Sequence, residues 1–113
     1  MQKGLSRRAV LGGALASASA LSFSARADGT PVVHEVTIKR FTFEPAHLRV
    51  QAGDTIRWTN LDIAPHTASA DDISWDTGEL KQGESAEMVV NDGIILTYFC
   101  VFHPHMKGSI EIV

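Results

Sequence analysis

The stretch Tyr98-Phe99-Cys100-Val101-Phe102-His103-Pro104-His105-Met106 decides how this chain is interpreted. Between Cys100 and Met106 it carries a thiol, two imidazoles and a thioether, which are ligands that soft or borderline metals prefer. Cys100 is the only cysteine, so it has no partner within the chain for a disulfide. The stretch also lacks the four strong ligands typical of structural zinc. It therefore predicts a copper site that other parts of the chain complete.

His66 is the best candidate for the missing ligand. It follows the loop after a predicted strand at residues 55–60, whereas His34 lies inside the first predicted strand and His47 lies beside Pro45. Two strands of a sandwich can bring His66 and Cys100 to one end of a domain, where loops held by a rigid sheet often form sites. We assign no metal role to His34 or His47.

Short segments of alternating apolar and polar residues, separated by turn signals, run through the rest of the chain. Each has the period of two that is typical of a half-buried strand. The predicted strands cover residues 32–39, 41–44, 48–50, 55–60, 85–90, 94–99 and 109–113, and residues 71–83 are expected to be irregular. No segment keeps a helical period. The pattern predicts an all-β fold, an antiparallel sandwich or a small barrel.

The N-terminus differs in character from the rest of the sequence. Lys3, Arg7 and Arg8 precede an uncharged run at residues 9–25, and Ala25-Arg26-Ala27 has the small-x-small form of a cleavage site. The run is shorter than the ~20 strongly apolar residues of a membrane span. The Ser6-Arg7-Arg8 sequence resembles a twin-arginine signal, which predicts export to the periplasm. We therefore expect a cleaved signal at residues 1–27 and a single domain at residues 28–113.

Cleavage changes the charge of the chain. It removes four of the ten basic residues and none of the 13 acidic ones, and so leaves a formal charge of −7. This charge argues against nucleic acid as a partner and permits steering toward a basic protein surface. We expect a monomer that does not associate stably with a membrane.

Four segments together resemble the cupredoxins, or type 1 blue copper proteins: residues 41–45, residues 53–60, Pro65-His66-Thr67, and Tyr98 to Met106 followed by Gly108. The resemblance implies a Greek-key β-sandwich of two sheets that binds one type 1 copper ion. It places His66, Cys100 and His103 as equatorial ligands and Met106 as the weak axial ligand. The short Cys-x-x-His-x-x-Met spacing is most similar to the amicyanins, which implies an amine dehydrogenase as electron donor and a c-type cytochrome as acceptor.

The chemistry of this ligand set is that of a one-electron carrier and not of an enzyme. Two imidazoles, a thiolate and a distant thioether suit both Cu(I) and Cu(II), so little has to move when the electron does. We expect Phe99, Val101 and Phe102 to surround the sulfur with apolar groups, and His105 to face solvent near the site. Thr67 and Asn60 are candidates for hydrogen bonds toward the Cys100 loop. Trp58 and Trp75 are expected to be packing residues.

Two other classes of function compete with this interpretation. A copper storage or delivery protein could use the same ligands, but the chain has no Met-rich or His-rich tract outside the site. An enzyme with Cys100 as nucleophile is disfavoured because Cys100 follows an apolar strand and no oxyanion motif is visible.

Overall fold

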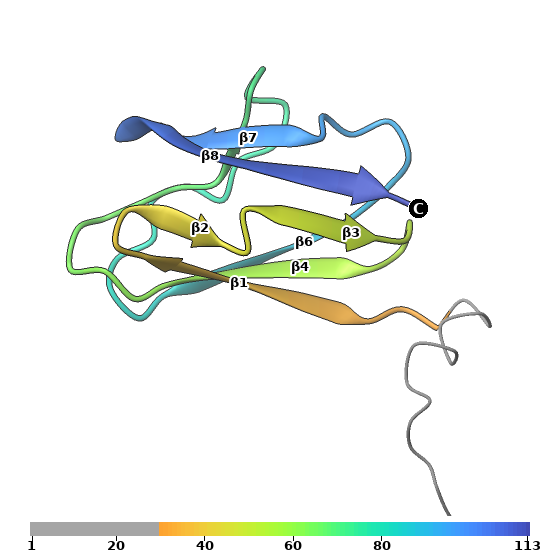
Figure 1. Ribbon diagram of the computed structural model, residues 1–113, viewed down its shortest axis with the longest axis horizontal. Coiled ribbons are helices and arrows are strands. Elements are labelled where there is room, and N and C mark those ends of the chain that lie inside the picture. Colours follow the sequence, from red (N-terminus) through yellow and green to blue (C-terminus); the bar gives the residue numbers. More distant parts are fainter. Residues whose placement is uncertain (1–29) are drawn as a thin grey trace, which may run out of the picture. The chain divides into compact units, whose positions relative to one another are not determined.

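Strands, turns and bends make up residues 30–113, the part of the chain that the structure, a computed structural model, describes. The expected export signal at residues 1–27 lies outside this part. No helix in the described range is long and apolar enough to cross a membrane. The strands are β1 (Val33–Lys39), β2 (Thr42–Glu44), β3 (His47–Val50), β4 (Thr55–Asn60), β5 (Ser69–Ala70), β6 (Ser85–Val89), β7 (Thr97–Cys100) and β8 (His103–Ile112) (Figure 1).

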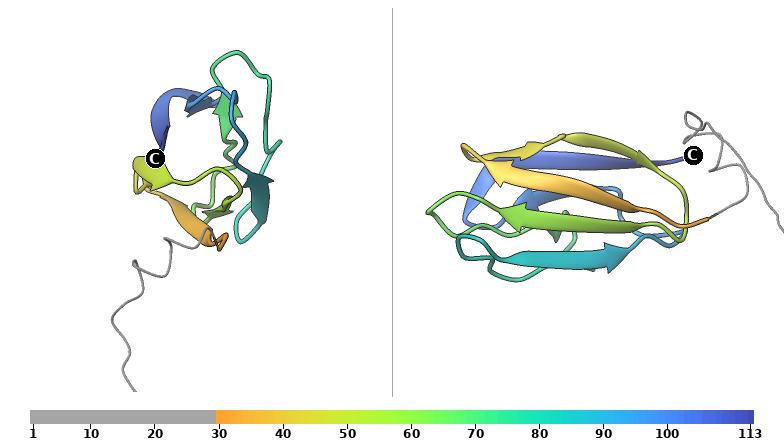
Figure 2. Two further views of the ribbon diagram at one scale, coloured as in Figure 1. Left: turned by 90° about the vertical axis from the view of Figure 1, so that its right-hand side faces the viewer. Right: turned by 90° about the horizontal axis from the view of Figure 1, so that it is seen from below.

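The strands form two sheets of four, which confirms the predicted all-β sandwich. One sheet has the order β2-β1-β4-β6 and the other has the order β3-β8-β7-β5. Figure 2 shows β1, β4 and β6 side by side when the domain is seen from below. Alternate side chains of both sheets point inward, and these inward residues build the core.

Two pairs of strands are parallel, which corrects the expectation of an antiparallel sandwich. β1 pairs in parallel with β4, and β3 pairs in parallel with β8. The chain leaves the first sheet after β2, contributes β3 to the second sheet and returns as β4, so β4 runs in the same direction as β1. Parallel neighbours need a crossover of this kind. Alternation of residues reports which face a strand buries and not the direction of its neighbour.

The core is centred on aromatic rings. Trp58 on β4 is fully buried, and its ring lies 5.6 Å from that of Trp75 and 5.5 Å from that of Tyr98. Both tryptophans pack in or against the core cluster, as predicted. Arg57, one residue before Trp58, points outward and bridges Glu35 and Glu87 at 2.7 Å each.

The ends of two strands differ from the prediction. β7 begins at Thr97 and not at residue 94, because a turn around Gly93, with φ of 88°, occupies the start of the predicted strand. β8 begins at His103 and not at residue 109, because His103 pairs with Cys100 and residues 107–109 pair with β7, before residues 109–112 pair with β3. The earlier start of β8 brings the predicted ligand segment into the sheet.

Candidate metal centre

The segment between Cys100 and His103 is a tight hairpin turn. Cys100 is the last residue of β7, His103 is the first of β8, and the two are partners in the strand ladder. The turn residues Val101 and Phe102 are 41% and 47% exposed, because they point away from the sheet. Whether their remaining buried parts cover the sulfur stays a prediction. Phe99 is half-buried, and Cys100 is fully buried.

His66 lies against Cys100 although 33 residues separate them in the sequence. Backbone hydrogen bonds to Leu80 in both directions, at 3.1 and 2.8 Å, hold His66 in place. The ring is fully buried, and its Nδ1 lies 3.7 Å from Cys100 Sγ. Metal–thiolate and metal–imidazole bonds of about 2.3 and 2.0 Å that meet at about 120° place the two donor atoms about 3.7 Å apart. The pair therefore fits two ligands of one ion.

Asp62 determines which nitrogen of His66 faces the sulfur. Its Oδ2 lies 2.8 Å from His66 Nε2, and a carboxylate only accepts hydrogen bonds. Nε2 therefore carries the proton, and Nδ1 turns its lone pair toward Cys100. Burial raises the pKa of Asp62, but N–H groups of Phe41 and Arg40 and the His66 ring outweigh this effect and keep the pKa below its ordinary value.

The same carboxylate holds the turn between β1 and β2. It accepts hydrogen bonds from the N–H groups of Arg40 at 2.8 Å and Phe41 at 2.9 Å. These two residues have φ of 55° and 60°, a left-handed conformation that costs a residue other than glycine about 1–2 kcal/mol. The Phe41 ring then lies edge-on to the rings of His66 and His103, with centroids 5.0 and 4.7 Å away.

Sequence reasoning missed both Asp62 and Phe41. The spacing of four residues between Asp62 and His66 was an available signal for Asp62. Phe41 had no comparable signal, since only the fold brings the β1–β2 turn to the β7–β8 turn. Figure 1 shows these turns and the loop after β4 at the same end of the domain.

Thr67 contacts the Cys100 loop twice, as expected. Its N–H donates to Cys100 Sγ at 3.4 Å, and its hydroxyl accepts from the Val101 N–H at 3.0 Å. The expectation for Asn60 is wrong. The Asn60 amide bonds the carbonyls of Ala64 and Leu80 and the N–H of Asp62, so it fixes the loop before His66 and not the Cys100 loop.

The remaining predicted ligands lie on β8. The His103 ring is half-buried with its centroid 5.1 Å from that of His66. Met106 is buried, and His105 is exposed with its ring centroid 6.5 Å from that of His103. As the side chains stand, no group of three or more His, Cys, Asp and Glu within residues 30–113 is close enough to hold an ion. The structure thus brings His66 and Cys100 together and places His103 beside His66.

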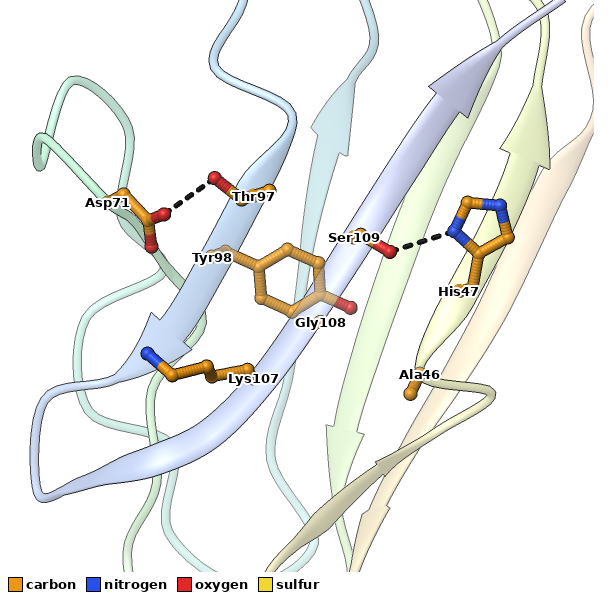
Figure 3. Close-up of a pocket in the computed structure, with 8 residues that line it drawn as sticks. All are labelled: Ala46, His47, Asp71, Thr97, Tyr98, Lys107, Gly108 and Ser109. Carbon is orange, nitrogen blue, oxygen red and sulfur yellow. Dashed lines mark hydrogen bonds between the residues drawn. The ribbon is translucent and has the colours of Figure 1, made fainter.

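The other two histidines are engaged elsewhere. His34 Nε2 lies 2.8 Å from the buried carboxylate of Asp54. His47 bonds Ser109 Oγ at 2.7 Å beside a hollow of about 350 Å³ over β7 and β8 (Figure 3). None of the four predicted ligands lines this hollow. The assignment of no metal role to His34 and His47 is consistent with these contacts.

Comparison with known proteins connects this geometry to a family. The family described as cupredoxin-like domain matches residues 11–112. The chain is 28% identical over 83 residues to amicyanin-alpha of Methylorubrum extorquens, covering 69% of this chain and 70% of the relative. It is 27% identical over 93 residues to amicyanin of Paracoccus denitrificans, covering 76% and 67%. The solved structure of a purple cupredoxin from Nitrosopumilus maritimus shares the fold, with a TM-score of 0.64, 23% identity and coverage of 71% and 99%.

Proposed function

Because the chain belongs to the cupredoxin-like domain family, we propose that it is a type 1 copper protein that carries single electrons between redox proteins in the periplasm. The observation that carries the proposal is the 3.7 Å separation of His66 Nδ1 and Cys100 Sγ in a buried setting. Copper bound there supplies a one-electron couple. His66, Cys100, His103 and Met106 would hold it.

The residues around His66 and Cys100 favour electron transfer over catalysis on a substrate. Asp62 fixes the His66 ring, and Thr67 fixes the sulfur through its N–H at 3.4 Å. Ligands held in this way move little between oxidation states, which lowers the reorganisation cost that a carrier has to meet. We therefore assign the chain no catalytic residues.

His103 is the proposed exit for electrons because it is the half-buried member of the set. Exposed apolar side chains gather around it. Phe41 contacts its ring, and the exposed Val101 and Phe102 form the turn that precedes it. An apolar surface of this kind suits brief docking on a partner. By analogy with the amicyanin relatives, the partners are an amine dehydrogenase and a c-type cytochrome.

Localisation in the periplasm rests on the twin-arginine sequence at residues 6–8 and on cleavage after Ala27. N-terminal sequencing of the exported protein tests both. A mature chain that starts at Asp28 supports the proposal, and retention of the uncleaved chain in the cytoplasm contradicts it.

Spectroscopy of the copper-loaded protein tests the function. We expect Cu(II) to give an intense thiolate-to-copper band in the visible spectrum and a matching electron paramagnetic resonance signal, both lost in Cys100→Ser. A colourless wild-type protein contradicts the proposal. Binding of Cu(I) without a reversible Cu(II)/Cu(I) couple indicates the alternative, a copper storage or delivery protein.

A further inference from the structure

A chain of hydrogen bonds runs from a surface carboxylate to the loop that carries Cys100. Ser69 Oγ lies 2.7 Å from Asp76 Oδ1, and Thr67 Oγ1 lies 2.9 Å from Ser69 Oγ. The Val101 N–H then lies 3.0 Å from Thr67 Oγ1. The chain therefore connects the loop after β5 with the β7–β8 turn.

The carboxylate sets the direction of the two side-chain hydrogen bonds in this chain. Asp76 only accepts, so the single hydroxyl proton of Ser69 is donated to it. Ser69 Oγ then offers only lone pairs, and Thr67 has to donate its own hydroxyl proton to Ser69. The Val101 N–H donates to a lone pair of the same Thr67 Oγ1, so this one oxygen joins the side-chain hydrogen bonds to the β7–β8 turn.

The hydrogen bonds of Ser69 and Thr67 matter because both residues are buried. Ser69 is fully buried and Thr67 is 2% exposed, so water does not readily replace a lost partner. Asp76 itself is held by the Gly78 N–H, which donates to the same Oδ1 at 3.0 Å. Backbone bonds from Thr77 N–H to Ala68 and from Ala70 N–H to Trp75 fasten this loop to β5.

We propose that Asp76 is a positioning residue of the candidate metal centre. By accepting from Ser69 it fixes the hydrogen bond from Thr67 to Ser69, and so holds Thr67 where its Oγ1 meets the Val101 N–H and its own N–H reaches Cys100 Sγ. The significance for copper rests on the proposed function, whereas the positioning of the loop does not. An oriented N–H on the sulfur stabilises negative charge there, which favours the reduced site and raises its potential.

Amide hydrogen exchange of the metal-free protein, followed residue by residue by NMR, tests the positioning. In Asp76→Ala we expect exchange at Val101 to become about tenfold faster, the factor that corresponds to loss of one hydrogen bond. Exchange at Val36, in the other sheet, should not change. Asp76→Asn retains an acceptor oxygen and should exchange like the wild type. Asp72→Ala is the matched control, since Asp72 is exposed in the same loop and accepts from Ser74.

A second variant protects the test if Asp76→Ala fails to fold. Ser69→Ala removes the buried hydroxyl that joins Asp76 to Thr67 and leaves Asp76 bonded to the Gly78 N–H. It should accelerate amide exchange at Val101 as much as Asp76→Ala does. Unchanged exchange at Val101 in a folded Asp76→Ala protein overturns the proposal. Equal acceleration in Asp76→Asn also overturns it, because the charge and not the acceptor would then be responsible.

The copper-loaded proteins provide a separate readout. We expect Asp76→Ala to shift the thiolate-to-copper band and lower the reduction potential, and Asp76→Asn to restore both toward the wild type. A band and potential that stay at wild-type values in Asp76→Ala contradict the proposed effect on the metal. If the wild-type protein gives no such band, the proposed function fails, and the exchange data still decide whether Asp76 positions the loop.

Discussion

Replacement of Asp62 tests a side chain that accepts three hydrogen bonds beside the candidate metal centre. Asp62 Oδ1 accepts from the Arg40 N–H, and Oδ2 accepts from the Phe41 N–H and from His66 Nε2. Asp62→Ala removes all three acceptors at once. Asp62→Asn keeps one oxygen, which can serve either the Oδ1 or the Oδ2 position.

The expected loss of stability follows from these contacts. The His66 ring is fully buried, so its Nε2–H is left without a partner in Asp62→Ala, at a cost of about 1–3 kcal/mol. The N–H groups of Arg40 and Phe41 lie in an exposed turn where water replaces the carboxylate, so each adds only about 0.5 kcal/mol. The free energy of unfolding should therefore fall by about 2–4 kcal/mol. Asp62→Asn should cost about 1 kcal/mol, because an oxygen at the Oδ2 position preserves the buried bond.

Urea unfolding of the metal-free protein, followed by tryptophan fluorescence, measures both values. Glu79→Ala, at an exposed carboxylate, is the control and should leave the midpoint unchanged. The reasoning is refuted if Asp62→Ala unfolds at the wild-type midpoint, or if Asp62→Asn costs as much as Asp62→Ala. The pH dependence gives a further check. The folded-state pKa of Asp62 lies below the ordinary value of 3.8, so its contribution is present above that pH and is lost as the pH falls toward the lowered pKa.

Other parts of the molecule support three further predictions. Burial raises the pKa of Tyr98, the only tyrosine, to about 12, and the Trp58 indole opposes the shift. Ultraviolet titration at 295 nm should therefore show one transition near that pH in the folded protein and one near pH 10 in urea. Because this pKa is raised, Tyr98 should contribute about 3 kcal/mol to the free energy of unfolding below pH 10, and this contribution should be lost between pH 10 and 12. A transition of the folded protein near pH 10 would contradict the burial of Tyr98. Gly108→Ala places a Cβ against Cζ of the Tyr98 ring and should lower the free energy of unfolding by about 3 kcal/mol, whereas an unchanged urea midpoint would mean that the ring can move aside. His105→Ala should keep the thiolate-to-copper band because His105 is exposed, and loss of the band would make His105 a ligand in place of His103.

Alternation of residues was enough to locate most strands. Residues 55–60 were predicted as a strand, and the structure has β4 there with Ile56 and Trp58 fully buried. The start of β7 was misplaced because residues 94–96 favour strands by type, while the turn around Gly93 keeps them out of the sheet. Strand direction was predicted wrongly for β1 with β4 and for β3 with β8, since the period of two is the same for parallel and antiparallel neighbours.

The donor residues of the candidate site were visible in the sequence, but the groups that hold them were not. Cys100, His103 and Met106 crowd into one short segment, and donor type alone indicates a soft or borderline metal. Phe41 and Asp76 act through contacts between distant segments, and a phenyl ring or a carboxylate in a loop carries no local mark of such a role. Asp62 lies four residues before His66, but its contacts with the β1–β2 turn depend on the fold.

By itself, the sequence determined the position of most strands and the clustering of thiol, imidazole and thioether donors near the C-terminus, because both properties depend on residue type and short spacing. Only the tertiary structure decided that His66 Nδ1 lies 3.7 Å from Cys100 Sγ and that Val101 and Phe102 face outward. It also decided that one carboxylate, Asp62, serves both the β1–β2 turn and His66. These features depend on which strands become neighbours. That choice is made by the burial of the whole core, to which residues from both sheets contribute together.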